Sequence, residues 1–230
     1  MIYFAMTDTT TAHKTNFIRN IIDQDLENGV HNTIITRFPP EPNGFLHIGH
    51  AKAICINFGI ARDYNGRCHM RFDDTNPSRD YDCYTAAILK DIHWLGFDYG
   101  KHLYYASDYY QTLYECALKL IEQGDAYVDS LSAKEMHDYR GTLTEGGKNS
   151  PDRDRTIEEN LSLFKEMRQG KHPEGSFTLR AKIDMQSGNI NLRDPVIYRI
   201  LDKTHHRSKD QWPIYPTYDF AHALSDATEG

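Results

Sequence analysis

The chain has 230 residues, of which 39% are hydrophobic, 26% charged and 12% aromatic, with a mean hydropathy of -0.67. This composition excludes a disordered chain and a membrane-embedded protein, since no apolar run reaches the roughly 18 to 20 residues that a bilayer-spanning helix needs. The formal charge of -7 excludes a strongly basic nucleic-acid-binding protein, although residues 148–210 carry 13 Lys and Arg against 10 Asp and Glu.

The N-terminal residues and the cysteines predict a cytoplasmic protein. Residues 1–6 are briefly apolar but have no basic leader, so we interpret residues 1–14 as a loose N-terminus rather than a signal peptide. Cys55, Cys68, Cys83 and Cys116 form no C-x-x-C pair, which favours reduced structural thiols over a zinc site or disulfides.

Two predicted strands flank a predicted helix early in the chain. Residues 33–38 are β-branched and aromatic, and they run into the Pro- and Gly-rich loop 39–44. Apolar residues recur at helical spacing over 47–64, where Asn65-Gly66 supplies a stop, and residues 68–72 predict a second strand. Strand, helix and strand within about forty residues predict a βαβ unit in a parallel sheet.

Further helices and strands are predicted after residue 80. Two helices carry Ile88 with Ile92 and Leu113 with Ala117, and they end at Gly96 and Gly124. Capping-box spacings open two more helices on either side of a polar loop at 141–151, with Ser132 before Glu135 and Thr156 before Glu159. Residues 176–184 alternate and predict a half-buried antiparallel strand with Arg180 and Lys182 on its polar side. Residues 191–201 predict a strand pair around Asp194-Pro195.

Two histidines three residues apart stand where the first predicted helix begins. His47 and His50 follow the first strand and its loop, at the position where open α/β sheets bind ligands and where helix N–H groups attract phosphate. Each imidazole can donate to a phosphate oxygen, and Gly49 between them leaves room for a flat ring. The segment predicts a nucleotide site, and the tetrapeptide alone would equally suit two solvated or metal-binding histidines.

Residues 37–52, RFPPEPNGFLHIGHAK, closely resemble the signature of class I aminoacyl-tRNA synthetases in its glutaminyl-tRNA synthetase version. Four more motifs follow in family order: RFDDTNP at 71–77, YRGTL at 139–143, RDPV at 193–196 and YPTYDF at 215–220. The resemblance implies an α/β fold that begins with the first half of a Rossmann-like catalytic domain at 15–106. An inserted α+β acceptor-stem-binding domain at 107–212 and the start of the second half at 213–230 would follow.

The resemblance also implies roles for single residues. His47 and His50 would be catalytic, stabilising charge on the ATP α-phosphate. Arg37, Asp73, Tyr218 and His222 would bind glutamine, with Asp73 holding the α-ammonium and the neutral Tyr218 phenol pairing with the amide. By residue type alone, Asp73 could equally form a turn and Tyr218 could be a core tyrosine. The implied ATP site comprises Glu41, Pro42, Asn43, His47, Ile48, Gly49, His50, Ala51, Lys52 and Ala53.

The implied reaction is nucleotidyl transfer followed by acyl transfer. Glutamine attacks the α-phosphorus of ATP, which enters with Mg²⁺ as a substrate, and the terminal ribose of tRNA(Gln) then captures the adenylate. We expect no tightly bound cofactor, no metal site, no membrane partner and a monomeric parent enzyme. Contacts to the tRNA acceptor are expected from residues that could also be solvated surface groups: Arg140, Leu143, Lys148, Arg180 and Lys182.

The sequence departs from the family in one respect. The Lys-rich second signature of the class is absent, and Arg207-Ser208-Lys209 precedes Tyr218, so it is no substitute. We therefore expect an incomplete amino-terminal portion of a glutamine–tRNA ligase that charges tRNA negligibly by itself. The alternatives are a glutamyl-tRNA synthetase of the archaeal or eukaryotic type, which usually has Ser in place of Asn43, and a non-catalytic ATP- or tRNA-acceptor-binding fragment.

Overall fold

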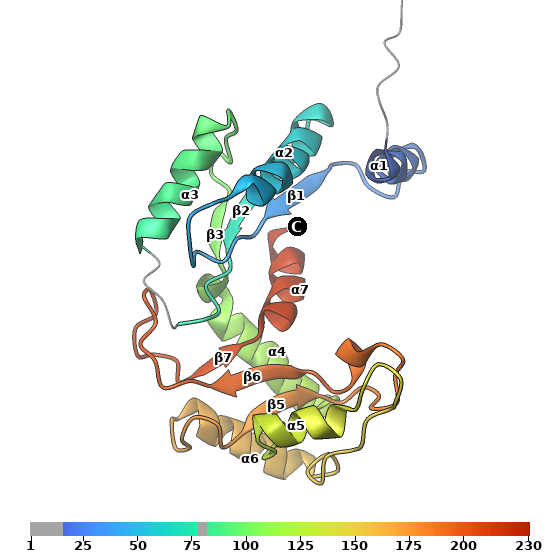
Figure 1. Cartoon of the computed structure of the whole chain (residues 1–230), viewed down its shortest axis with the longest axis vertical. Helices are drawn as coiled ribbons and strands as arrows, with labels where there is room; N and C mark the ends of the chain where they lie inside the picture. Colours follow the sequence, from blue (N-terminus) through green and yellow to red (C-terminus); the bar gives the residue numbers. More distant parts are fainter. Residues whose placement is uncertain (1–15, 78–81) are drawn as a thin grey trace, which may run out of the picture.

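The computed structural model describes residues 16–77 and 82–230, so the loose N-terminus expected over 1–14 lies outside the described residues. The strands of these residues form two sheets, one with three strands and one with four. Figure 1 shows the first sheet with helices α2 and α3 in its upper half and the second sheet with α5 and α6 in its lower half.

The first sheet is parallel, as predicted. Strands β1 (Ile35–Phe38), β2 (Arg67–Phe72) and β3 (Leu103–Tyr105) lie in the order β1-β2-β3. Helices α2 (Ile48–Asp63) and α3 (Asp82–Trp94) connect them, which confirms the βαβ unit. Strand β3 and helix α1 (Phe17–Glu27), which precedes β1, were not predicted.

The hydrophobic core of this half comes from the predicted helical stripe and the strand interiors. Helix α2 contributes Ile54 and Phe58, and α3 contributes Ile88 and Ile92. Met70 and Phe72 of β2 are fully buried between these helices and the rest of the sheet. The apolar faces of both helices therefore fix the sheet whose strand ends carry the candidate site.

The second sheet is antiparallel, as predicted for residues 176–184. Strands β4 (Ala126–Asp129), β5 (Thr178–Ala181), β6 (Val196–Ile200) and β7 (Ile214–Pro216) lie in chain order. Because β7 pairs with β6, this sheet extends past residue 212. Its helices are α4 (Tyr110–Gln123), which follows the 3-10 turn η1 (Ala106–Tyr109), α5 (Ala133–Arg140) and α6 (Ile157–Arg168).

One strand prediction is wrong. Residues 191–201 form not a strand pair but the 3-10 turn η2 (Ile190–Leu192) followed by the single strand β6. Asp194 has a φ of 42°, in the left-handed region that ends an extended segment. Its side chain accepts hydrogen bonds from Ile183 N and from Arg153, so the turn is held by contacts distant in sequence.

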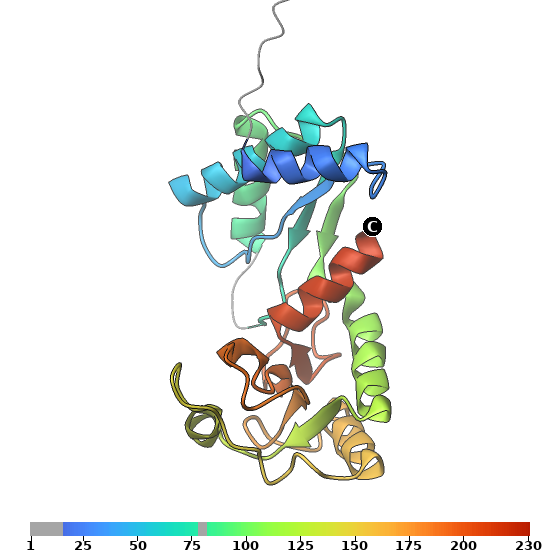
Figure 2. The same ribbon diagram turned by 90° about the vertical axis from the view of Figure 1, so that its right-hand side faces the viewer.

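Helix α7 (Tyr218–Glu229) joins the two halves. It begins after β7 and runs back toward the first sheet, as the turned view shows (Figure 2). Its far end reaches β2, where Glu229 pairs with Arg71 at 2.9 Å. Among the described residues no helix combines the length and the apolar character needed to cross a membrane.

Candidate active site

The two histidines of the signature form a capping box at the start of α2. His47 is the N-cap residue, and its Nδ1 accepts a hydrogen bond from Gly49 N at 3.0 Å. His47 N in turn donates to Nδ1 of His50 at 3.2 Å, and the two rings lie 3.9 Å apart. Because both Nδ1 atoms accept, each neutral ring carries its proton on Nε2. The cap therefore leaves two Nε2–H donors beside the helix N-terminus.

The electrostatics suit a neutral donor. Burial, and secondarily the nearby charge of His47, lower the pKa of His50, so this ring is neutral at pH 7. A neutral imidazole and the positive end of the α2 dipole can both favour a phosphate that gains charge during a reaction. Gly49 is required by space, because a Cβ there would lie 2.8 Å from Cε1 of His47.

The loop before α2 meets the end of β2. Asp73 N donates to Pro40 O at 3.0 Å, which ties the two strand ends together. Within the loop, Asn43 Nδ2 donates to Glu41 Oε2 at 2.7 Å, while Pro42 is buried. The structure thus brings the predicted loop residues and Asp73 to one edge of the parallel sheet, as the βαβ topology predicts.

A cleft of about 370 Å³ opens between this edge and the second sheet. It combines acidic residues of both halves with arginines of the second, and its charged lining residues are Glu41, Asp73, Asp219, Arg140, Arg193 and Arg199. Tyr218 lines the same cleft and is 57% exposed, which excludes the alternative of an ordinary core tyrosine. The cleft therefore offers carboxylates and cations to one bound molecule.

Asp73 is held in a fixed orientation within this cleft. Its Oδ1 accepts from Thr75 Oγ1 at 2.8 Å, and its Oδ2 lies 3.4 Å from Nε2 of His222. Burial alone would raise the pKa of Asp73, but the hydrogen bonds from His222 and Thr75 outweigh it and hold that pKa below its ordinary value. The carboxylate is thus ionised and suited to an ammonium group.

Arg37 is linked to His222, another predicted glutamine-binding residue, through Asp226 and Arg71. Its Nε donates to Asp226 Oδ1 at 2.6 Å, and its side chain lines a smaller cavity of about 210 Å³ with His69 and Glu229. Asp73, Tyr218 and His222 stay together, with the Tyr218 and His222 rings 6.1 Å apart. The role of these four residues in glutamine binding stays a prediction.

The predicted acceptor residues separate into a loop and a strand. Leu143 is 81% exposed at the tip of the loop after α5, and Arg140 and Lys148, both exposed, flank it. Lys182 follows β5 and pairs with Asp154 at 3.1 Å. The loop is braced from below, since the buried Arg193 Nη1 donates to three of its carbonyls, those of Arg140, Thr142 and Glu145, at 2.8 to 2.9 Å.

Arg180 corrects the prediction of a solvent-facing contact. Its side chain is 2% exposed, its Nη1 donates to Asp129 Oδ2 at 2.5 Å and its Nε donates to Asp194 O at 2.7 Å. A guanidinium enclosed in this way cannot reach an external phosphate. The predicted alternation of side chains along β5 is confirmed, but other residues of the same half cover its polar side.

Two arginines inside motifs were not assigned roles from the sequence. Arg193 braces the loop described above, and Arg71, fully buried in β2, contacts Asp226, Glu229 and His222. The available signal was a charged residue between two apolar strand residues, Met70 and Phe72. Such a residue is buried only when paired, so its position predicts an internal ion network.

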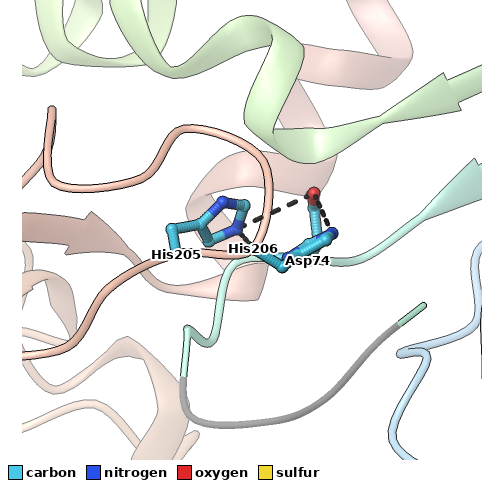
Figure 3. A group of neighbouring side chains, drawn as sticks. All are labelled: Asp74, His205 and His206. Carbon is cyan, nitrogen blue, oxygen red and sulfur yellow. Dashed lines mark hydrogen bonds and ion pairs between the residues drawn. The ribbon is translucent and has the colours of Figure 1, made fainter.

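Asp74, next to Asp73, joins three elements at the junction of the two halves. Its carboxylate accepts from Ser107 N at 2.8 Å and Ser107 Oγ at 2.6 Å, and its carbonyl accepts from Tyr110. His205 and His206, in the loop before β7, lie beside it (Figure 3). Potential ligand atoms of the three residues fall within 4.8 Å of one another, as in a metal site.

The hydrogen bonds of His205 argue against a metal at this cluster. Its Nδ1 accepts from the backbone N–H groups of Arg207 and Ser208, at 3.2 and 3.1 Å. Its Nε2 must then carry the proton, which it donates to Asp74 O at 2.8 Å. Since a metal needs an unprotonated ring nitrogen, the geometry fits an internal connection between the halves better than a metal site.

This connection predicts a specific pH dependence of stability. Burial raises the pKa of Asp74 from 3.8 to about 6, so folding disfavours its ionised form. The stability that Asp74 contributes to the folded state is fully present below pH 3.8 and is lost as the pH rises through about 6. In urea denaturation, the free energy of unfolding of the unsubstituted chain minus that of Asp74→Asn should fall by about 2 kcal/mol between pH 4 and 7.

The Asn variant loses part of the Ser107 contacts at every pH, so only the slope of this difference is informative. His206 titrates in the same range, because burial, followed by the charge of His205, lowers its pKa to about 4. The stability that His206 contributes is present above pH 6.5 and lost toward pH 4. Because His206 Nε2 lies 3.6 Å from Asp74 Oδ2, both proteins carry His206→Gln in this comparison, which removes the second titration. A difference that grows with pH would contradict the raised pKa of Asp74.

Comparisons with known proteins bear on this site. Residues 33–230 match the sequence profile described as tRNA synthetases class I (E and Q), catalytic domain. The chain is 63% identical over 215 residues to a glutamine–tRNA ligase of Chromobacterium violaceum, covering 94% of this chain and 38% of that protein. It is 60% identical over 225 residues to the glutamine–tRNA ligase of Nitrobacter winogradskyi, covering 97% and 40%. The chain thus spans about two fifths of the length of these relatives.

A solved structure shares the fold. A glutamate tRNA ligase from Elizabethkingia meningosepticum, crystallised with its amino acid, aligns with a TM-score of 0.55 and 21% identity, over 85% of this chain and 42% of that one. The glutamate–tRNA synthetase of Elizabethkingia anophelis aligns equally well. At this identity the similarity concerns the fold alone.

Proposed function

The chain belongs to the class I tRNA synthetases for glutamate and glutamine, and on that premise we propose that it forms the ATP- and amino-acid-binding part of a glutamine–tRNA ligase. The observation that carries the proposal is the meeting of the His47–His50 cap and the held Asp73 carboxylate at one edge of the parallel sheet. An activated amino acid needs both, because its ammonium and the ATP α-phosphate lie close together.

In the proposed reaction the glutamine carboxylate attacks the α-phosphorus of ATP, which enters with Mg²⁺, and pyrophosphate leaves. The Nε2–H donors of His47 and His50 stabilise the charge that develops on the α-phosphate oxygens. Asp73 holds the α-ammonium, and a hydroxyl of the terminal ribose of tRNA(Gln) then attacks the acyl carbon of the adenylate, forming the ester as AMP leaves. The residues position and stabilise rather than form a covalent intermediate.

The second sheet and its helices are proposed as an inserted domain that receives the tRNA acceptor end. The support is the braced loop with Leu143 at its tip and Arg140 and Lys148 beside it. Arg193 and Arg199 add positive charge on the cleft wall nearest this loop. Lys182 stays in the proposal as a peripheral contact, and Arg180 does not.

Glutamine is proposed over glutamate because Tyr218, the residue proposed to meet the substrate side chain, is a neutral phenol. The phenol can pair with an amide, whereas it gives a carboxylate no compensating charge. Arg37, the arginine predicted for this pocket, is instead paired with Asp226. Asn43 and the glutamine-specific names of the curated relatives point the same way.

The amino-acid preference can be measured directly on this chain. Stable sulfamoyl analogues of glutaminyl- and glutamyl-adenylate would be titrated by calorimetry, and we expect the glutaminyl analogue to bind at least about tenfold more tightly. Asp73→Asn should weaken both analogues, because it removes the charge that meets the ammonium. A preference for the glutamyl analogue would favour the glutamate-specific alternative, and failure of both to bind would favour an acceptor-binding role alone.

A further inference from the structure

Arg71 is fully buried, lies next to the C-terminal residue of β2 and contacts helix α7. Its Nη1 donates to Glu229 Oε2 at 2.9 Å, and its Nη2 donates to Asp226 Oδ1 at 2.6 Å. The same Nη2 lies 3.0 Å from Nδ1 of His222. One guanidinium thus contacts three side chains of α7, among them a residue of the proposed amino-acid site.

The chemistry of arginine fixes the direction of the contact with His222. A guanidinium in a protein stays protonated and can only donate, so His222 Nδ1 must be the acceptor. The ring of His222 then carries its proton on Nε2. That atom lies 3.4 Å from Asp73 Oδ2, within ion-pair distance of the carboxylate.

We propose that Arg71 is a positioning residue that locks His222 in its Nε2–H tautomer, and that this tautomer orients Asp73 for an α-ammonium group. Thr75 donates to Oδ1, the other oxygen of Asp73. The relay, meaning the chain of contacts from Arg71 through His222 to Asp73 Oδ2, therefore completes the orientation of the carboxylate. This inference rests on the proposed function, in which Asp73 meets the ammonium of glutamine.

The relay requires arginine rather than lysine. Donation from Nη2 to both His222 and Asp226, together with donation from Nη1 to Glu229, uses the fork of a planar guanidinium. An ammonium at the end of a lysine has one nitrogen and cannot reach all three acceptors from the same backbone position. The two α7 carboxylates also balance the buried cation, with Glu229 3% exposed.

The first test measures the tautomer of His222 at a fixed pH of 8. In long-range ¹H–¹⁵N spectra of the unsubstituted chain, His222 should show a protonated Nε2 and an unprotonated Nδ1, with the signals assigned by their loss in His222→Gln. In Arg71→Gln the ring should lose this single state and give averaged nitrogen shifts. An Nδ1–H tautomer in the unsubstituted chain, or an unchanged ring in Arg71→Gln, overturns the proposal.

The second test measures binding of the glutaminyl-adenylate analogue. Arg71→Gln should bind it roughly tenfold more weakly, the size expected for a lost orienting hydrogen bond to a charged group. Arg153→Gln is the matched control, since it removes another ion pair of a largely buried arginine, with Asp194 in the second half. It should lower stability but leave both the tautomer of His222 and the affinity unchanged. Equal affinities of Arg71→Gln and the unsubstituted chain would overturn the positioning role.

Two variants at position 222 keep the proposal testable if Arg71→Gln does not fold. His222→Gln places an amide oxygen toward Arg71 and an amide N–H toward Asp73, so it should retain affinity within about threefold. His222→Leu, which can neither accept nor donate, should lose about tenfold. Equal losses in the two variants contradict the relay. If the unsubstituted chain binds no analogue while its tautomer shifts as expected, the proposed function fails and the Arg71–His222 lock remains.

Discussion

Replacing His50 with alanine should lower the rate of adenylate formation by about two orders of magnitude and change the affinity for ATP by less than about threefold. The capping box uses Nδ1 of His50 to accept from His47 N, and it leaves the Nε2–H as a donor. A neutral donor gains most when the α-phosphate oxygens acquire charge in the transition state. Removal of one such donor typically costs a factor of about 100 to 1,000 in rate.

The measurement needs a protein of the relatives' full length. A chimaera would join this chain to the remainder of the Chromobacterium violaceum ligase, with which it shares 63% identity over 215 residues. Single-turnover adenylate formation would be followed with tRNA(Gln) present, and ATP affinity would be measured separately. Cys55→Ala, an exposed change on the same helix, is the control and should leave both quantities unchanged. Equal losses in rate and in affinity would make His50 a plain binding residue.

Local signals in the sequence predicted several helix starts correctly. The spacings Ser132–Glu135 and Thr156–Glu159 form capping boxes at the starts of α5 and α6, because these side chains satisfy N–H groups within their own first turn. The βαβ order around His47 likewise needs only neighbours in sequence. The strand β3, with three residues, was missed because its place depends on pairing with β2 and three residues carry no period.

The periodicity of a strand shows which side chains share a face but not what covers that face. Leu179 and Arg180 point to opposite sides of β5, as the alternation predicts, yet both are buried. The cover for Arg180 comes from Asp129, 51 residues away in sequence. Arg71 repeats this pattern in β2, where its partners lie more than 150 residues further along the chain. Sequence reasoning therefore predicted candidate site residues but did not anticipate the buried charges near them.

The close approach of β1 and β2 predicts the largest loss of stability, in Gly66→Ala. A Cβ at position 66 would lie 2.0 Å from the carbonyl oxygen of Ile34, a backbone atom that already accepts from Arg67 N. The Cβ and the carbonyl oxygen are both fixed by the backbone, so the hydrogen bond that begins the pairing of β1 and β2 has to separate. We expect the free energy of unfolding to fall by about 3 kcal/mol, at the upper end of the usual cost of overpacking.

The matched control for Gly66→Ala is Gly59→Ala, in the interior of α2, where no atom lies within 4 Å of the added Cβ. Alanine has the higher helix propensity, so this variant should gain up to about 1 kcal/mol. Urea denaturation followed by circular dichroism measures both changes in one protein. Opposite signs at two glycines of one βαβ unit would separate the backbone clash from any general effect of alanine. An unchanged free energy of unfolding in Gly66→Ala would mean that β1 and β2 are less closely packed at their start than the structure shows.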